Sequence, residues 1–131
     1  MRKILFFLIV ALTAVSCTES FEDRCRREAK EYSERECPRM VDTFIRMDSM
    51  AFESEPAGLI YYYSVIGDLD NAELLTPDVV EDFRTRLLES IRNDINMKRY
   101  KDKGFAFTYR YRSDSTGKPF VEATFGPEDY N

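Results

Sequence analysis

An alternation of aromatic and smaller or charged side chains near the C-terminus constrains the fold more than any other pattern in this chain. From residue 105 to residue 112, an aromatic residue at every second position is followed by an alanine, a threonine or an arginine. Because successive side chains of a strand point to opposite faces, this pattern predicts a strand with one aromatic and one polar face. The turn-forming residues 113–117 and the apolar segment 120–125 complete a β-hairpin.

A second β-hairpin is predicted nearer the N-terminus. Segments 42–52 and 59–66 flank residues 53–58, which include a proline and a glycine and favour a turn. Segment 59–66 is apolar or aromatic on both faces, which is typical of a central strand.

The apolar side chains of segment 42–52 change face part-way along it. Ile45 and Met47 share one face of an extended chain, whereas Met50 and Phe52 fall on the other. One extra residue near Asp48-Ser49 restores a common apolar face. The sequence therefore predicts a β-bulge at this point.

Residues 76–104 carry the clearest helix signals. Thr76-Pro77-Asp78 supplies a cap, a proline at the first helical position and an acid in the first turn, and Gly104 supplies a stop. Between them, apolar residues recur at helical spacing: Val80, Phe83, Leu87, Leu88, Ile91 and Ile95. This stripe predicts one long core helix.

A narrower helical stripe precedes the first hairpin. Phe21, Cys25, Ala29 and Tyr32 are spaced four, four and three residues apart, with Ser20 as a suitable N-cap. Pro38 should end this helix. Two roles stay open for it, a stalk between the membrane and the domain or a helix that docks by its one stripe.

These elements predict an α+β fold. We expect an N-terminal helix, a β-hairpin, a long helix and a second β-hairpin, forming a four-stranded and mostly antiparallel sheet with the long helix on one face. The lipidated N-terminus and its helix would span residues 17–37, and the small α+β domain residues 38–131.

Residues 1–16 differ in composition from the rest of the chain. Two bases are followed by a run of twelve residues with a single polar member, and the segment holds no acid, which is typical of a signal peptide. The run ends in Ala14-Val15-Ser16-Cys17, which resembles the lipobox of bacterial lipoproteins. The resemblance implies that Cys17 becomes the lipidated first residue, carrying diacylglyceryl and palmitate-type chains. An ordinary secretory signal with Cys17 as a structural thiol is the alternative.

The charge balance disfavours some partners. The chain has 19 Lys and Arg against 24 Asp and Glu, and without the two bases of residues 1–16 the balance is 17 against 24, or −7. Nucleic acid and anionic lipid headgroups are poor matches for such a domain. Lipid anchoring implies the outer membrane, on its periplasmic or its surface side; the acids of residues 18–23 resemble a surface-export signal and equally suit a helix N-terminus.

Few catalytic arrangements are available to this chain. It has no histidine, which excludes Ser-His-Asp and Cys-His catalysis and most zinc sites. The acidic loop 68–73 lacks the glycine and the distant glutamate of a calcium loop. No pair of carboxylates stands out as a hydrolase site, so we expect no catalytic residue, metal or cofactor.

The two remaining cysteines leave an alternative open. Cys25 and Cys37 are an even pair in an exported chain, which favours a disulfide. A continuous helix to Glu36 would instead hold their Cα atoms about 18 Å apart, too far for a bridge. We favour free thiols, and a chain reversal near Ser33 would restore the bridge.

One polar surface is the candidate binding site. Thr108, Arg110 and Arg112 should line the sheet face opposite the long helix, where Tyr62 is placed to join them. Tyrosine and arginine are favoured at recognition surfaces. The alternative is that the tyrosines belong to the core and the arginines form a solvated face.

The sequence therefore predicts a non-enzymatic, membrane-anchored lipoprotein whose small domain binds another envelope protein, a peptide or a glycan. An inhibitor or immunity-type protein that blocks a toxin or hydrolase is the alternative.

Overall fold

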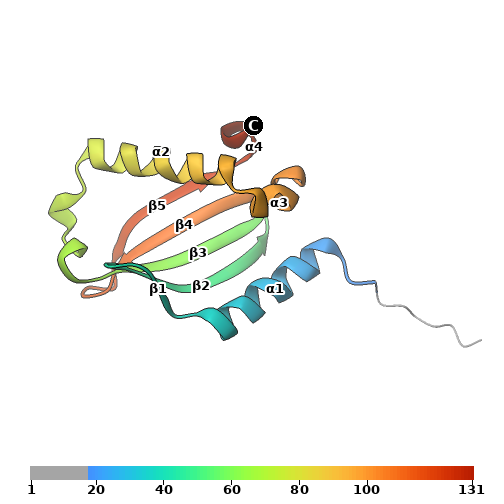
Figure 1. Cartoon of the computed structure of the whole chain (residues 1–131), viewed down its shortest axis with the longest axis horizontal. Helices are drawn as coiled ribbons and strands as arrows, with labels where there is room; N and C mark the ends of the chain where they lie inside the picture. Colours follow the sequence, from blue (N-terminus) through green and yellow to red (C-terminus); the bar gives the residue numbers. More distant parts are fainter. Residues whose placement is uncertain (1–17) are drawn as a thin grey trace, which may run out of the picture.

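Five strands form one sheet in the order in which they follow along the chain (Figure 1). The computed structural model describes residues 18–131, so the predicted signal peptide and Cys17 lie outside the described residues. The strands are β1 (Arg39–Asp42), β2 (Ile45–Ser54), β3 (Ala57–Val65), β4 (Ala106–Ser113) and β5 (Pro119–Phe125). Neighbouring strands are antiparallel except β3 and β4, which are parallel.

The helices fill the connections between and around these strands. The longer ones are α1 (Phe21–Glu36) and α2 (Pro77–Asn93), with shorter α3 (Lys98–Asp102) and α4 (Pro127–Tyr130). Three short 3₁₀ turns complete the set: η1 (Gly67–Leu69), η2 (Ala72–Leu74) and η3 (Ile95–Met97). No helix within residues 18–131 is both long and apolar enough to cross a membrane.

The prediction of a four-stranded sheet was wrong by one strand. Residues 39–42 form the separate edge strand β1, which turns back through Thr43 and Phe44 to pair with β2. Its four residues are all exposed, so they carry none of the apolar alternation that marks a half-buried strand. The predicted α+β class, the mostly antiparallel pairing and the central position of β3 are confirmed.

The predicted β-bulge is confirmed. The β2–β3 register shifts between Met47 and Ser49, which leaves Asp48 without a partner on β3. Met47 then lies opposite Tyr63, and Met50 lies opposite Tyr61. The bulge thus keeps the apolar side chains of β2 on a single face.

Both long helices pack on the same face of the sheet. α1 lies beside β2 (Figure 1). Its stripe buries Cys25 and Ala29 in the same core as Phe107 of β4 and Ile91 of α2. The Ser33 hydroxyl joins α1 to β2, lying 2.8 Å from both the amide nitrogen and the carbonyl oxygen of Met50. Within the described chain α1 therefore docks on the sheet.

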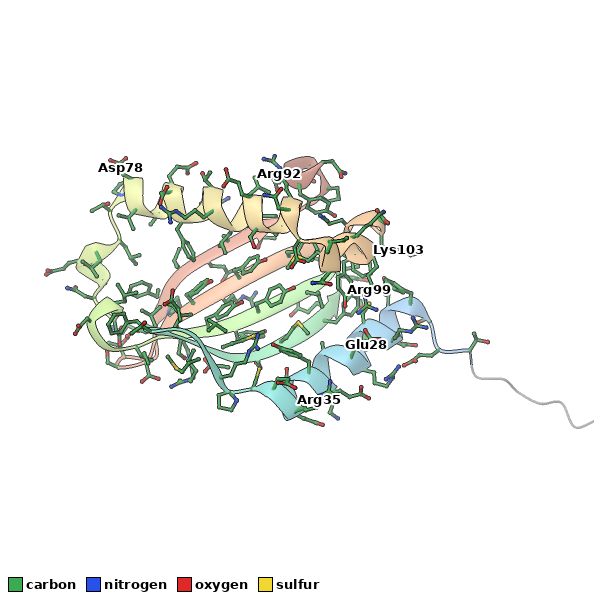
Figure 2. The ribbon with its side chains drawn as sticks, viewed as in Figure 1. Glu28, Arg35, Asp78, Arg92, Arg99 and Lys103 are labelled. Carbon is green, nitrogen blue, oxygen red and sulfur yellow. The ribbon has the colours of Figure 1, made fainter. Side chains whose placement is uncertain are left out.

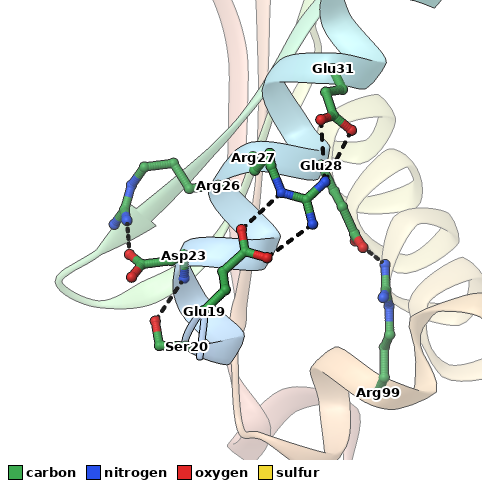
Figure 3. Close-up of polar contacts among 8 residues, drawn as sticks. All are labelled: Glu19, Ser20, Asp23, Arg26, Arg27, Glu28, Glu31 and Arg99. Atoms are coloured by element: carbon green, nitrogen blue, oxygen red, sulfur yellow. Dashed lines mark hydrogen bonds and ion pairs between the residues drawn. The ribbon is translucent and has the colours of Figure 1, made fainter. Parts of the chain in front are cut away.

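Polar contacts hold the exposed side of α1 in place. Ser20 caps the helix as predicted, since its hydroxyl accepts from the Asp23 amide at 3.1 Å (Figure 3). Glu28 binds Arg99 of α3 at 2.7 Å, and Arg99 points from α3 toward α1 (Figures 2 and 3). This ion pair joins the first helix to the segment before β4.

The core of the sheet is aromatic. Tyr61 stacks on Tyr109 and Tyr63 on Tyr111, with ring centroids 4.9 and 4.6 Å apart. Each pair sits directly across the parallel β3–β4 register. The aromatic positions predicted to face the helix are therefore on the helix-covered face, as expected.

The single long helix predicted over residues 76–104 is broken in the structure. α2 ends at Asn93, and the Asp94 carboxylate accepts from the Asn96 amide at 2.9 Å, which caps the next turn. The Lys101 amine folds back onto the carbonyl oxygen of Ile91 at 2.8 Å and satisfies the helix end. Ile95, expected in the core, is 81% exposed because the chain turns away at this point.

Cys25 is buried and Cys37 is half-buried, and both are free thiols. α1 runs without a break from Phe21 to Glu36, so nearly the whole stretch between the two cysteines is helical. The chain reversal near Ser33 that would have brought them together is absent.

We expect the buried tyrosines to make the folded state less stable at high pH. Burial raises the pKa of Tyr63 to about 12 and raises the pKa of Tyr61 well above its usual value. Because these folded-state values exceed the unfolded value near 10, the unfolded chain ionises first, and stability that is complete below about pH 10 falls as the pH rises. We expect the denaturant midpoint to drop between about pH 10 and pH 12, and Tyr63→Phe to reduce the drop. A midpoint that stays constant over this range would contradict the assignment.

Candidate functional site

The face of the sheet opposite the helices carries all four residues predicted as a binding surface. Arg110 and Arg112 of β4 lie beside Tyr62 and Ser64 of β3 in the parallel register, and Thr108 lies beside Ile60. The stacked tyrosine pairs alternate with these residues along β3 and β4 and lie on the other face, toward the helices. Residues 18–131 place no helix over this surface, which we call the open face.

The β-bulge residue Asp48 is the centre of the polar network on the open face. Its carboxylate accepts from Arg46 Nε at 2.8 Å and from the Ser64 hydroxyl at 2.6 Å. Arg112 Nε lies 3.6 Å from the same carboxylate. The bulge therefore turns an acidic side chain toward two arginines and a fully buried serine, whose hydroxyl it satisfies.

Arg46 extends this network to the turn after β4. Its second contact is with Asp114, at 2.9 Å between Nη2 and Oδ1. The hydrogen bond to Asp48 and the second one to Asp114 raise the pKa of Arg46. Arg46 thus bridges two carboxylates and holds the network in position.

Contacts with Glu122 and Tyr62 hold the guanidinium group of Arg110 in place. Its Nε donates to Glu122 of β5 at 3.2 Å, and its Nη1 lies 3.5 Å from the Tyr62 hydroxyl. The guanidinium carbon lies 5.9 Å from the centre of the Tyr62 ring, within the range of a cation–π contact. These contacts fix the direction of Arg110 along the sheet.

Arg112, unlike Arg110, is held through Nε alone. That atom donates to the Ser64 hydroxyl at 3.1 Å, and the side chain remains 57% exposed. Its two terminal nitrogens make no further polar contact within residues 18–131. Arg112 therefore presents two oriented donors to the solvent, which suits a carboxylate or carbonyl ligand.

These side chains surround a shallow hollow of about 350 Å³ on the open face. Its polar lining comes from the four strands β2 to β5: Asp48, Ser49, Tyr62, Arg110, Arg112 and Glu122. Thr108 stands outside it and pairs with Thr124 at 3.1 Å. The structure therefore brings together three of the four predicted residues.

The two acids of the hollow are engaged in ion pairs. Asp48 and Glu122 are both paired with guanidinium groups, so neither is an unpaired acid or base. Within residues 18–131 no cluster of three or more acidic or cysteine side chains is arranged to hold a metal ion. Oriented donors and an aromatic ring remain, and both are means of recognition.

Sequence reasoning missed Asp48 and Ser64 as members of this surface. The signal was available, because an acid at the point where the apolar face changes marks both a bulge and a polar side chain outside the core. Ser64 sits in a strand read as apolar on both faces. Its role depends on the β3–β4 register, which local periodicity does not specify.

Comparison with protein families matches residues 20–121 to the family described as Domain of unknown function (DUF8479). The chain belongs to this family. The matched range contains α1 and the sheet through the start of β5, so the DUF8479 domain includes the N-terminal helix as well as the open face. Comparison with curated proteins gives no match.

Two solved structures share the fold of this DUF8479 member. One is a protein from Pseudomonas aeruginosa described as secreted, with a TM-score of 0.69 and 21% identity over 84% of this chain and 92% of that one. The other is the pilotin EpsS of the Vibrio vulnificus type 2 secretion system, with a TM-score of 0.61 and 10% identity over 84% and 91%. At these identities the likeness shows a common fold.

Proposed function

We propose that this chain is a non-catalytic binding module of the bacterial cell envelope, tethered by lipid at Cys17, which holds another envelope protein against its open face. The observation that carries the proposal is that residues 18–131 place all their helices on one face of the sheet, which leaves a polar and aromatic hollow uncovered by them on the other. A sheet face with fixed arginine donors and a half-buried tyrosine is a suitable protein contact surface.

The fold comparisons support this proposal in part. One protein with this fold is the pilotin of a type 2 secretion system, and a second is described as secreted. A role at the envelope also agrees with the leader and lipobox read from residues 1–17. An outer-membrane lipid anchor remains part of the proposal.

The proposal predicts that two arginines dominate capture of the partner. Replacing Arg110 and Arg112 together with alanine should reduce recovery of the partner from envelope extracts by at least about tenfold, because oriented arginines are frequent hot spots. The fold should be unaffected, since Asp48 keeps its bond to Arg46. Affinity capture with the full chain, followed by mass spectrometry, measures the effect.

A matched variant on the other side of the molecule provides the control. Lys30 and Arg35 of α1 are also exposed and also lie near acids, so Lys30→Ala with Arg35→Ala removes the same charge away from the open face. Partner recovery should be unchanged in this control. Equal recovery by both double variants would reject the open face as the contact surface.

A further inference from the structure

A second uncovered surface lies on the helix side of the sheet. It is at the end of the sheet where the chain passes from β3 to α2, a connection that Figure 1 shows. Here η1, η2 and the first turns of α2 enclose a groove of about 170 Å³ against the ends of the strands. Its lining side chains are all aliphatic or aromatic, and they include Val65 of β3, Phe83 of α2 and Phe120 of β5. We call this surface the apolar groove.

The wall of this groove is less buried than a core helix should be. Leu74 is 44% exposed and Val79 is 49% exposed, although both line the groove. Val80 and Phe83 are half-buried, and Ile91 is the one fully buried residue of α2. The apolar stripe of α2 is therefore covered by the sheet at its C-terminal end and left partly open at its N-terminal end.

The chain that forms the wall is strongly acidic. Residues 67–83 contain six acids and no lysine or arginine: Asp68, Asp70, Glu73, Asp78, Glu81 and Asp82. Asp70 accepts from the Ser115 amide, and Asp82 pairs with Arg86. The other four form no ion pair within residues 18–131, and Asp78 stands at the outer end of α2 (Figure 2).

The bases nearest in sequence to the lining do not offset these acids. Arg84 follows Phe83, but its guanidinium lies over the Phe125 ring, 5.3 Å from the centroid. Lys118 lies two residues before Phe120. Three more bases are next to lining residues in sequence, but their guanidinium groups are held in the polar network of the open face: Arg46, Arg110 and Arg112. The groove thus combines an apolar floor with unpaired negative charge along its wall, which selects a ligand with an apolar face and basic flanks.

The backbone around the groove favours a helical ligand over an extended one. β2, β3 and β4 are each paired on both sides, and α2 satisfies its own backbone bonds. β5 also lines the groove and is an edge strand, but its free backbone groups point outward in the plane of the sheet and not over the groove floor. An extended peptide lying on the floor would therefore leave its own amide groups unpaired on an apolar surface. A helix satisfies its backbone internally and presents side chains alone.

We infer that the apolar groove binds an amphipathic helix of a partner protein whose leucine-like face is flanked by lysine or arginine. The groove opens on the opposite side of the sheet from the polar side chains of the open face, although Tyr111 and Val121 line both hollows. The inference therefore goes beyond the proposed function, and an experiment can reject the binding role of one surface without rejecting that of the other.

Fluorescence anisotropy with designed peptides tests the inference, using the full chain in nanodiscs of neutral lipid. The probe is a helical peptide of about 18 residues, or roughly 27 Å, with leucines on one face and lysines at both ends. One control peptide has glutamate in place of each lysine, and a second has the same composition with the leucines scattered around the helix. We expect both controls to bind at least about tenfold more weakly than the probe.

Variants of the exposed wall residues locate the binding. Leu74→Gln with Val79→Gln should lower the affinity for the probe peptide at least about tenfold. Ile95→Gln, at an exposed apolar residue outside the groove, should change that affinity by less than about twofold. Arg110→Ala with Arg112→Ala should leave probe binding unchanged, even if the open-face proposal fails.

Several results would overturn the inference. The first is that the chain does not bind the probe. The second is that the scattered or the glutamate peptide binds as tightly as the probe. The third is that the Leu74/Val79 double variant binds the probe as tightly as the unmodified chain does. Binding of the probe to empty nanodiscs alone would assign the affinity to lipid. A dimer that excludes the probe and is dispersed by Leu74→Gln with Val79→Gln would assign the groove to a second copy of this chain.

Discussion

Replacing Phe107 with alanine should lower the free energy of unfolding by about 3–5 kcal/mol, the largest loss we expect from any single substitution. Phe107 is 0% exposed and lies at the centre of the core. Its ring meets Tyr130 edge-on with centroids 5.7 Å apart, and it contacts Tyr100 in the same manner at 6.5 Å. Truncation removes these contacts and leaves a cavity between the sheet and the surrounding helices.

Denaturant unfolding measures this loss. The midpoint should fall while the dependence on denaturant concentration stays constant, because the surface exposed on unfolding hardly changes. Phe107→Leu should cost much less, since it fills most of the volume. A domain of this size has a total stability of about 5–15 kcal/mol, so a loss below about 1 kcal/mol in Phe107→Ala would contradict the central position given to this ring.

Gly58→Ala should be the second most damaging change, at about 3 kcal/mol, the upper part of the range for overpacking. Gly58 lies opposite Ala106 where the parallel strands β3 and β4 begin to pair. A Cβ atom at this position would overlap the carbonyl oxygen of Ala106 and lie 2.8 Å from its carbonyl carbon. Backbone atoms cannot rotate away as a side chain does, so the two strands would have to separate.

Gly117→Ala separates this clash from the ordinary effect of replacing a glycine. Gly117 has a φ of +71°, and a Cβ atom added there would meet no other atom within 4 Å. The cost of this variant should therefore be about 1 kcal/mol, from backbone strain alone. Thermal unfolding of the two variants compares them directly. Equal losses would show that strand separation at Gly58 contributes nothing.

The sheet was largely predictable because apolar and polar residues alternate along a half-buried strand. The alternation of residues 105–112 assigned Arg110 and Arg112 to the open face, and the break in alternation after Met47 located the bulge. β1 was missed because all four of its residues are exposed, which removes the apolar signal. The break after Asn93 was missed because it is made by the Asp94 and Lys101 side chains, whose contacts interrupt no periodicity.

The binding surfaces were predictable only in part. Tyr62, Arg110 and Arg112 could be placed together by face, but the hydrogen bonds that orient them pass through Asp48 and Ser64, which meet only after the register is fixed. The apolar groove was missed because Leu69, Leu74 and Leu75 sit in a connection dominated by acids. Their clustering with Val79 depends on how that connection folds over the sheet end.

Arginine footprinting in the native envelope tests the binding role of the open face most directly. Intact membranes and the purified full chain are treated with an arginine-selective reagent, and modification at each site is compared by mass spectrometry. The account predicts that Arg112, whose terminal nitrogens face solvent in the isolated domain, is protected in the envelope, while Arg35 of α1 reacts equally in both samples. Equal modification of Arg112 in membranes and in the purified protein would contradict it.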